Sequence, residues 1–221
     1  MSVRPPEFKD QSPKTEDQVT AIVLAAGRSR RMGAFKPLLP FGNSTVVESC
    51  IDSLRTAGIE SIVVVVGHRG EELRARLRNR SLTFAVNPDP DSEMSSSIAC
   101  GVELTDESTK ALLITPVDHP AVPSEVVTLL LKEWKNGALL AQPEYGGRGG
   151  HPVLIDSVYR PDLLALDPHE GLRALFSGHR EEVRRVPVDS PYVARDMDTW
   201  EDYRQLHEDV FGGAPPAIDQ Y

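Results

Sequence analysis

The chain of 221 residues has little of several features that would define its class. It has two cysteines, Cys50 and Cys100, too few for the disulfide framework of a small secreted domain. Each lies in a segment with helical periodicity, so we expect two buried and reduced thiols. No apolar run approaches the roughly 20 residues that span a bilayer, and residues 1–18 lack the apolar segment of a signal peptide. These absences predict a cytoplasmic protein without a membrane partner.

Positive charge is also scarce, but it is unevenly distributed. The chain has 24 Lys and Arg against 33 Asp and Glu, for a net charge of -9. Nucleic-acid binding requires larger basic surfaces than this composition offers, so we expect no nucleic-acid partner. Residues 19–47 nevertheless contain no Asp or Glu, and they include four cations, Arg28, Arg30, Arg31 and Lys36. A cationic segment in an acidic chain predicts a local anion-binding site.

Short apolar runs alternate with segments of helical periodicity through most of the chain. Several runs are continuously apolar, which favours buried and mostly parallel strands. The strand, helix, strand order predicts an α/β fold, a three-layer α/β/α sandwich around a Rossmann-like, mostly parallel sheet. The predicted strands are residues 20–24, 61–66, 82–86, 111–115, 139–142, 153–155 and 183–186.

One helix has a clear start in the sequence. Val47, Ile51 and Leu54 form an apolar stripe at helical spacing. The stripe follows the pattern of a capping box that runs from Thr45 to Glu48. We therefore expect a helix that begins at this point and packs on the sheet.

The two ends differ in composition from the rest. Residues 1–18 combine prolines with polar and charged residues, and residues 212–221 begin Gly-Gly-Ala-Pro-Pro. Neither segment offers enough apolar surface to pack, so we predict flexible tails around one domain at residues 19–211.

The cationic segment follows the first predicted strand, where ligands bind in α/β sheets. It is not a Walker A loop, because no Gly-Lys-Ser or Gly-Lys-Thr closes it, and only Gly27 and Gly33 are spaced through it, unlike the dinucleotide fingerprint. We expect Gly27 to take a positive φ and let the backbone approach an anion, with charge from Arg31 and Lys36. The alternative is a solvated turn, which the lack of acidic neighbours disfavours.

The motifs Leu-Ala-Ala-Gly at 24–27, Arg-Met-Gly at 31–33 and Lys-Pro-Leu-Leu at 36–39 resemble a known signature. It is that of nucleotidyltransferases that move a nucleotidyl group from an NTP to a phosphorylated acceptor. The likeness is greatest to the molybdenum cofactor cytidylyltransferases and guanylyltransferases, and it covers the whole predicted domain. The resemblance implies that the loop wraps the triphosphate and that Arg31 and Lys36 neutralise it as catalytic residues.

A second motif places Asp118 just beyond an apolar strand, between prolines. A carboxylate at this edge can hold a magnesium ion that bridges triphosphate oxygens. It could also be an ordinary aspartate in a proline-rich turn. The resemblance favours a catalytic metal ligand, because the family has an Asp followed by one residue and Pro here. His119 fills the intervening position, and we expect a structural role for it.

A third motif contains Asp198 ahead of the last predicted helix. The resemblance implies that Asp198 approaches the metal from the side opposite Asp118. Asp198 also fits a helix N-cap, with Glu201 three residues later as its capping-box partner. Both roles stay open from the sequence.

Further segments resemble family elements that contact the nucleotide. Asn87 and the three serines at 95–97 match a stretch near the base or phosphate, although serines at a helix start are also good caps. Glu93 stands where relatives usually have Gly before the Met. The predicted nucleotide-binding residues are Leu24, Ala25, Ala26, Gly27, Arg28, Lys36, Asn87, Ser95, Ser96 and Ser97.

Two later motifs resemble the acceptor side of the family. A glycine-rich loop precedes His151, and such a loop can close over a ligand. The resemblance implies acceptor binding by His151 and by Arg173 of a Gly-Leu-Arg motif. A turn and a helix start with ordinary surface charge are the structural alternatives.

These parts permit in-line nucleotidyl transfer with release of pyrophosphate. The second pKa of a phosphate monoester is about 6, so the acceptor is already a nucleophile at neutral pH and no general base is required. The resemblance implies Mg²⁺ as the cofactor, with Mn²⁺ as an alternative. The resemblance also favours CTP over GTP, because the guanine-using relatives typically have two glycines where this chain has Ala26-Gly27. It further implies molybdopterin as the acceptor.

Two alternatives remain. Similar loops occur in nucleotidyltransferases that use sugar phosphates or other small phosphorylated acceptors. A non-catalytic, nucleotide-binding chaperone for a molybdoenzyme apoprotein would have the same loop. Such a relic need not keep Lys36, Asp118 and Asp198 together, so their presence favours an enzyme.

Overall fold

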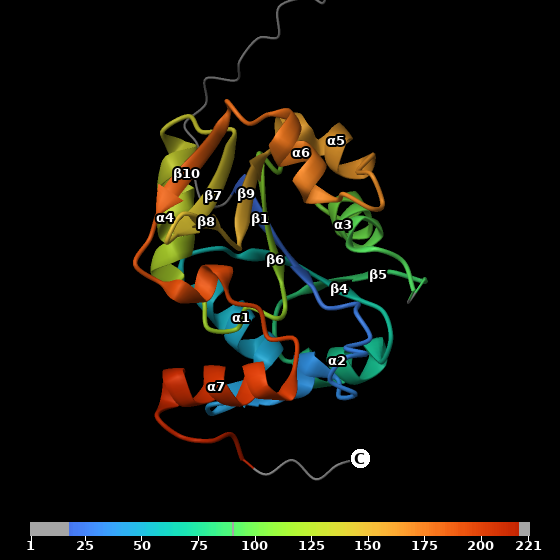
Figure 1. Cartoon of the computed structure of the whole chain (residues 1–221). Helices are drawn as coiled ribbons and strands as arrows, with labels where there is room; N and C mark the ends of the chain where they lie inside the picture. The colour runs from blue at the N-terminus through green and yellow to red at the C-terminus, as the bar shows by residue number, and fades with distance from the viewer. Residues whose placement is uncertain (1–17, 90, 217–221) are drawn as a thin grey trace, which may run out of the picture.

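The computed structural model describes residues 18–89 and 91–216 (Figure 1). The predicted N-terminal tail lies outside this range except for Gln18, and so do residues 217–221 of the predicted C-terminal tail. The last helix ends at Phe211, and its C-cap residue Gly212 has a φ of +73°. The carbonyl of Gly213 is hydrogen-bonded to Nδ1 of His207 at 2.7 Å. Ordered contacts therefore continue two residues beyond the predicted end of the domain.

All seven predicted strands are present, with ends that differ from the predicted ones by at most three residues. Three short strands, β2, β3 and β8, were not expected. The strands are β1 (Val19–Leu24), β2 (Pro40–Phe41), β3 (Ser44–Thr45), β4 (Ser61–Val66), β5 (Thr83–Val86), β6 (Ala111–Pro116), β7 (Leu140–Tyr145), β8 (Arg148–Gly149), β9 (Val153–Asp156) and β10 (Val183–Pro187).

The main sheet has the strand order β10-β7-β9-β6-β1-β4-β5, and β8 pairs with β7. The pairs of β1 with β4, β1 with β6, β4 with β5 and β7 with β10 are parallel. Strand β9 is antiparallel to both β6 and β7. The sheet is therefore mixed but mostly parallel, and the carboxyl ends of β1, β4, β5 and β6 lie at one edge.

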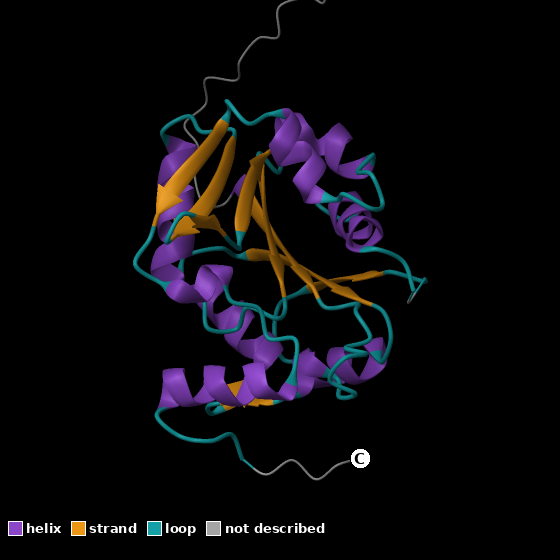
Figure 2. Cartoon of the chain, in the orientation of Figure 1, coloured by secondary structure: helices purple, strands orange, loops and turns teal. Residues whose placement is uncertain are grey.

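Helices cover both faces of the sheet (Figure 2). Helices α3, α5 and α6 lie over one face, and α1, α2, α4 and α7 lie on the other side in Figure 1. In the described part of the chain, no helix is long and apolar enough to cross a membrane. The helices are α1 (Val46–Thr56), α2 (Gly70–Leu77), α3 (Met94–Glu103), α4 (Ser124–Lys135), α5 (Arg160–Leu164), α6 (Leu172–Gly178) and α7 (Trp200–Phe211), with 3-10 turns η2 (Lys36–Leu38), η3 (Ser157–Tyr159) and η4 (Pro191–Ala194).

Strand β1 shows how the sequence builds two cores. Its six residues are all buried, and alternate side chains point to opposite faces. Ala21 and Val23 join the core under α1, α2 and α4, whereas Ile22 and Leu24 join the core under α3 and α5. Burial on both faces explains the continuously apolar run. The three-layer α/β/α architecture expected from the sequence is confirmed.

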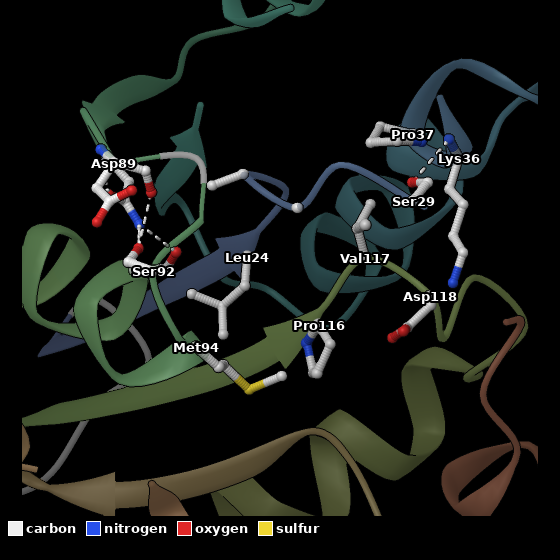
Figure 3. Close-up of a pocket in the computed structure, with 14 residues that line it drawn as sticks. Leu24, Ser29, Lys36, Pro37, Asp89, Ser92, Met94, Pro116, Val117 and Asp118 are labelled. Carbon is white, nitrogen blue, oxygen red and sulfur yellow. Dashed lines mark hydrogen bonds between the residues drawn. The ribbon is translucent and has the colours of Figure 1, made fainter. Parts of the chain in front are cut away.

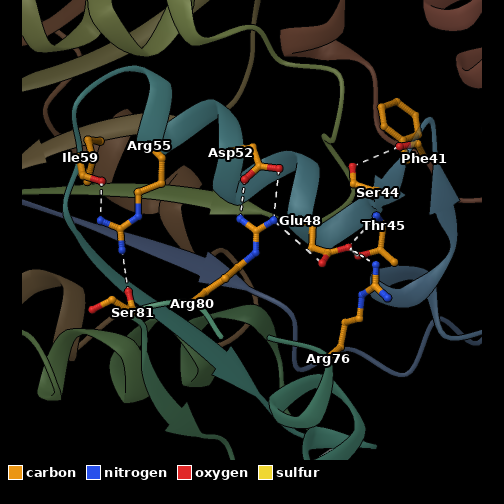
Figure 4. Close-up of polar contacts among 10 residues, drawn as sticks. All are labelled: Phe41, Ser44, Thr45, Glu48, Asp52, Arg55, Ile59, Arg76, Arg80 and Ser81. Carbon is orange, nitrogen blue, oxygen red and sulfur yellow. Dashed lines mark hydrogen bonds and ion pairs between the residues drawn. The ribbon is translucent and has the colours of Figure 1, made fainter. Parts of the chain in front are cut away.

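Helix α1 begins where the capping box predicted it. Oε2 of Glu48 accepts hydrogen bonds from the backbone N–H of Thr45 at 2.9 Å and from its hydroxyl at 2.7 Å. The same oxygen accepts a 2.7 Å bond from Arg76 of α2, so the box also ties two helices together (Figure 4). Both predicted thiols are free, with Cys50 buried in α1 and Cys100 partly buried in α3.

Candidate active site

A cavity of about 210 Å³ opens at the edge where the parallel strands end (Figure 3). Its walls come from the loops after β1, β5 and β6 and from the start of α3, as expected for a ligand site in an α/β sheet. The lining residues are Leu24, Ala26, Gly27, Ser29, Lys36, Pro37, Asn87, Asp89, Ser92, Met94, Ser97, Pro116, Val117 and Asp118.

The loop after β1 has unused backbone donors, and three of its residues, Ala26, Gly27 and Ser29, line this cavity. At the start of the loop, the N–H of Ala25 still extends the sheet, because it donates to the carbonyl of Val65 at 2.9 Å. Among the described residues, the N–H groups of residues 26–31 have no hydrogen-bond acceptor. A run of free N–H groups beside cationic side chains is suited to a polyanion such as a triphosphate.

The conformation of this loop differs from the expectation in one respect. Its positive φ angles lie at Ser29 (+51°) and Gly33 (+65°), so the prediction of a positive φ at Gly27 is wrong. The carbonyl of Ser29 accepts bonds from the N–H groups of Met32 and Gly33 and closes the turn. A Cβ at Gly27 would meet no atom within 4 Å, because this glycine faces open space. Gly27 therefore leaves room in the cavity rather than making a turn.

Two cations of the loop converge on Asp198. Nζ of Lys36 lies 2.7 Å from Oδ1, and Arg31 pairs with Oδ2. The Lys36 side chain is 9% exposed and that of Arg31 is 73% exposed, so the lysine is the fixed member of the pair. Burial opposes ionisation of Asp198, but the hydrogen bond and charge of Lys36, with Arg31, outweigh it and lower the pKa of this carboxyl. Asp198 is therefore ionised at neutral pH.

The capping role considered for Asp198 is wrong by one residue. The N-cap of α7 is Thr199, and its hydroxyl accepts from the N–H of Asp202 at 3.2 Å. Oδ2 of Asp202 accepts the N–H of Thr199 at 2.7 Å in return, so Glu201 is not the box partner. The carboxylate of Asp198 is free of helix capping and faces the cationic loop.

Asp118 lies at the other side of Lys36, directly after β6. The N–H of Val117 donates to the carbonyl of Leu24 at 3.1 Å and holds the two loops together. Oδ1 of Asp118 is buried without a hydrogen-bond partner among the described residues. Burial raises the pKa of the Asp118 carboxyl above its ordinary value, with opposing effects from the charges of His119 and Lys36. A buried and unpartnered carboxylate oxygen is costly unless a ligand completes its contacts.

The donor set fits a hard divalent cation. Asp118 has an oxygen without a partner, and Asp198 lies close enough to perturb it electrostatically. Mg²⁺ and Mn²⁺ prefer oxygen ligands, and Mg²⁺ commonly takes one or two carboxylates while phosphates and water fill the other positions. In the described part of the chain, no three His, Cys, Asp or Glu side chains form a complete metal site. A cation here would therefore need further oxygens from water or from a bound substrate.

Asn87 follows β5 and organises the opposite wall of the cavity. Its Nδ2 donates to the hydroxyls of Ser92 at 2.8 Å and Ser97 at 2.9 Å. Its Oδ1 accepts the N–H of Asp89 at 3.1 Å. Both ends of the amide are thus engaged within the protein, and Figure 3 shows Asp89 and Ser92 together on this wall.

His151 lies beside His119, with 5.3 Å between the ring centroids. The backbone N–H of His151 donates to the carbonyl oxygen of Val193 at 2.7 Å. A Cβ at Gly150 would lie 2.0 Å from this oxygen, so only glycine fits before the histidine. Nδ1 of His151 is buried and has no partner in the described structure. Burial and the charge of His119 lower the pKa of His151 to about 3, so its imidazole is neutral.

His119 is buried and its Nε2 lies 3.8 Å from Oδ1 of Asp118. Its Nδ1 is 3.4 Å from the carbonyl of Tyr192, a contact that holds the ring in place. His151, His119 and Asp118 thus follow one another toward the cavity.

Some predicted residues lie outside the cavity lining. Arg28 pairs with Asp91 at 3.3 Å on the exposed rim, and Arg173 is exposed on α6 without a described contact to the cavity. The structure also adds lining residues that the sequence did not single out, notably Ser29, Asp89, Ser92 and Met94. They line the cavity because of where their loops and the start of α3 lie, which residue types and spacing do not indicate. The remaining predicted residues outside the lining are Ala25, Arg31, Ser95, Ser96, His151 and Asp198.

Comparison with known proteins decides the family. The model of the MobA-like NTP transferase domain matches residues 21–186, most of the chain. The chain belongs to the MobA-like NTP transferase family. The resemblance expected from the sequence is thereby confirmed, and this member is a nucleotidyltransferase of that family.

Two curated relatives of this MobA-like protein have different names. The molybdenum cofactor cytidylyltransferase of Escherichia coli (strain K12) is 27% identical over 192 residues, which cover 84% of this chain and 93% of the relative. Nicotine blue oxidoreductase of Paenarthrobacter nicotinovorans is 27% identical over 197 residues, which cover 85% of this chain and 96% of the relative. The two names describe different reactions.

Solved structures agree with the fold of this MobA-like protein. Rv0371c from Mycobacterium tuberculosis H37Rv has a TM-score of 0.79 and 27% identity, and the match covers 88% of this chain and 100% of that one. A manganese complex of Rv0371c has a TM-score of 0.76 with 27% identity, covering 87% and 100% of the two chains. This structural neighbour thus binds manganese.

Proposed function

We propose that this protein transfers a nucleotidyl group from an NTP to a phosphorylated acceptor, with CMP favoured over GMP and molybdopterin as the acceptor. The main support for this proposal is the arrangement of charged and polar groups around Lys36. This buried lysine lies between the ionised Asp198 and the unpartnered oxygen of Asp118, next to the free N–H groups of residues 26–31. Cations, amide donors and a carboxylate that lacks a partner are what a metal-bound triphosphate requires.

The residues of the chain account for the parts of the reaction. The free N–H groups and Lys36 hold the triphosphate and reduce its repulsion of the acceptor phosphate. Asp118 and Asp198 would hold Mg²⁺ or Mn²⁺, which supplies charge stabilisation for the departing pyrophosphate. His151 lies beside His119, and its assignment to the acceptor rests on the resemblance of the loop before it to the acceptor side of the family. The transfer requires alignment and charge compensation rather than a general base.

The choice of nucleotide rests on Ala26, which lines the cavity and is almost fully buried. Its methyl group restricts how closely a base edge can approach, which supports a pyrimidine nucleotide. The choice of acceptor rests on the relative named as a molybdenum cofactor cytidylyltransferase. A sugar phosphate is the alternative acceptor.

The test is pyrophosphate release with Mg²⁺ by the full-length protein. CTP, GTP, UTP and ATP are each offered with molybdopterin or with a sugar phosphate, and Asp118→Asn serves as the inactive comparison. Release with CTP and molybdopterin that depends on Asp118 is the expected result. Release with a sugar phosphate alone would overturn the acceptor, and nucleotide binding without release with any acceptor would overturn the enzymatic function.

A further inference from the structure

The loop after β6 carries Asp118, and most of its backbone carbonyls are held by hydrogen bonds. Residues 117–122 include one proline, and prolines precede and follow them, so this stretch has fewer N–H donors than carbonyl acceptors. The loop is mostly buried, so its carbonyls need donors from elsewhere in the fold. Among the described residues, these donors are Sγ of Cys50 to Val117 (3.5 Å), the N–H of Met197 to Asp118 (3.1 Å), the N–H of Val122 to His119 (3.4 Å), Oγ of Ser49 to Pro120 (2.8 Å) and Oγ of Ser53 to Val122 (2.8 Å).

Three of these donors come from one side of α1. Ser49 and Ser53 are one turn apart, and Cys50 lies next to Ser49. Serine is a poorer helix former than alanine, so helix formation does not explain two serines in the middle of α1. Their hydroxyls donate to carbonyls 71 and 69 residues further along the chain, not to a carbonyl of their own helix. The two serines therefore hold the loop rather than the helix.

Helix α1 is itself fixed on another side. Glu48 accepts a hydrogen bond from Arg76, and Asp52 pairs with Arg80, so α1 is tied to α2 (Figure 4). A group held by a rigid element keeps its position more closely than one held by a mobile segment. Helix α1 is thus suited to fix the place of the loop after β6.

The same loop is joined to the segment that carries the second carboxylate. The backbone N–H of Met197 donates to the carbonyl of Asp118 at 3.1 Å, and Met197 directly precedes Asp198. The side chain of Met197 is fully buried in the core. A shift of the loop away from α1 would therefore act on both carboxylates.

The buried oxygen of Asp118 explains why this support is needed. Oδ1 has no hydrogen-bond partner among the described residues, which is costly for a carboxylate oxygen. A loop that was free to move would relieve this cost by turning the carboxylate toward water. The side chain of Asp118 is already 26% exposed, so a small shift would be enough.

We propose that Ser49 and Ser53 are positioning residues that hold Asp118 where it can bind the divalent cation of a metal–nucleotide complex. Neither serine is among the described residues that line the cavity, so both act through the backbone of the loop. This inference rests on the proposed function, because it takes Asp118 to be a ligand of that cation. The donors for the phosphates lie in the loop after β1, so the serines should matter only when metal is present.

The test measures binding of CTP and of GTP by titration calorimetry, once with Mn²⁺ and once with EDTA. The ratio of the two affinities is the gain that the metal provides. We expect the double variant Ser49→Ala/Ser53→Ala to reduce this gain about tenfold, as groups that orient a metal ligand do. Its affinity in EDTA should change less than about twofold. In Asp118→Asn the gain should already be small, and adding both serine changes should reduce it no further.

A second measurement uses the metal-free protein. Amide hydrogen exchange of Met197, whose N–H donates to the loop, should become about tenfold faster in the double serine variant, because the loop opens more easily. Exchange of Ala25, whose N–H donates to Val65 in the sheet, should not change. Thr128→Ala is the matched control, since the hydroxyl of Thr128 bonds within α4 to the carbonyl of Ser124. It should bind nucleotide as the wild type does in both conditions.

The possible results separate the failures. If the wild type gains no affinity from Mn²⁺ with either nucleotide, the proposed function fails and the inference fails with it. If the wild type gains affinity and the double serine variant gains as much, the positioning role is overturned. The same conclusion follows if that variant loses as much affinity in EDTA, or if the serine changes weaken Asp118→Asn as much as they weaken the wild type. Thermal unfolding identifies a variant that has lost its fold, and Ser49→Ala alone then replaces the pair, with an expected loss of about threefold.

Discussion

Two clusters of charged residues differ in how completely their members are satisfied. Between α1 and α2, Glu48 accepts from Thr45 and Arg76, while Arg80 pairs with Asp52 (Figure 4). This α1–α2 cluster has a partner for each of these charges within the chain. It therefore stabilises the fold without a ligand.

The cluster at the cavity is different. Lys36 and Arg31 share the carboxylate of Asp198, and one oxygen of Asp118 is buried without a described partner. Charges that are left incomplete within a fold reduce its stability and are retained where a ligand completes them. The number of ion pairs therefore does not separate a structural cluster from a ligand site, whereas the unsatisfied atoms do.

The largest effect should come from neutralising Asp118 in the cluster at the cavity. Asp118→Asn removes a buried charge that the protein compensates only in part, so we expect pyrophosphate release to fall about 1,000-fold. The melting temperature should stay the same or rise, because the cost of burying the charge is gone. Activity is measured by coupled pyrophosphate detection and stability by calorimetry. A variant that melts well below the wild type would place Asp118 among the structural charges.

The α1–α2 cluster should respond in the opposite way. Glu48→Ala removes the capping box of α1 and leaves Arg76 without its carboxylate, so we expect a loss of about 3 kcal/mol in the free energy of unfolding. The rate of the folded enzyme should change less than about twofold, because Glu48 lies outside the cavity lining. Urea unfolding measures the first quantity and initial rates the second. Glu71→Ala on the exposed face of α2, where the side chain is 95% exposed, is the matched control and should be neutral.

The pH dependence of stability should separate the clusters by sign. Burial raises the pKa of Glu48, but the hydrogen bonds from Arg76 and Thr45 outweigh this effect and lower the pKa below 4.5. The stabilisation of the fold by Glu48 is therefore present above pH 4.5 and is lost as the pH falls through the folded pKa. Burial raises the pKa of Asp118 above 3.8, so its favourable neutral form is lost as pH rises through the folded pKa.

Relative to the wild type at pH 7, Glu48→Gln should therefore be less stable by about 2 kcal/mol and Asp118→Asn at least as stable. Both differences should shrink toward pH 3. Urea denaturation at pH 3 to 7 provides the measurement. Differences of the same sign at pH 7 would contradict the distinction between the clusters.

The smallest effect should come from the rim of the site. Arg30 pairs with Asp91, and their side chains are 69% and 56% exposed. An exposed pair contributes little, so Arg30→Gln should change the free energy of unfolding by less than about 0.5 kcal/mol. The KM for the nucleotide should rise less than threefold. A loss of pyrophosphate release as large as that of Asp118→Asn would instead make Arg30 a member of the cluster at the cavity.

Seven of the strands, the two-sided burial of β1 and the start of α1 could be predicted from the sequence, because apolar periodicity and capping act over a few neighbouring residues. It also indicated the loop after β1, because a cationic stretch stands out in an acidic chain. Local patterns could not distinguish Asp198 from Thr199 as the cap of α7, since both fit a box and only the contact with Lys36 and Arg31 separates them.

Which polar groups already have hydrogen-bond partners depends on the packed fold. It left an oxygen of Asp118 without a described partner, and it engaged both ends of the Asn87 amide, which the sequence had suggested as a nucleotide ligand. The reason is that hydrogen-bond satisfaction depends on atoms brought together from distant segments. Residue types and spacing name the groups that can bind, and the packed fold determines which of them remain free to do so.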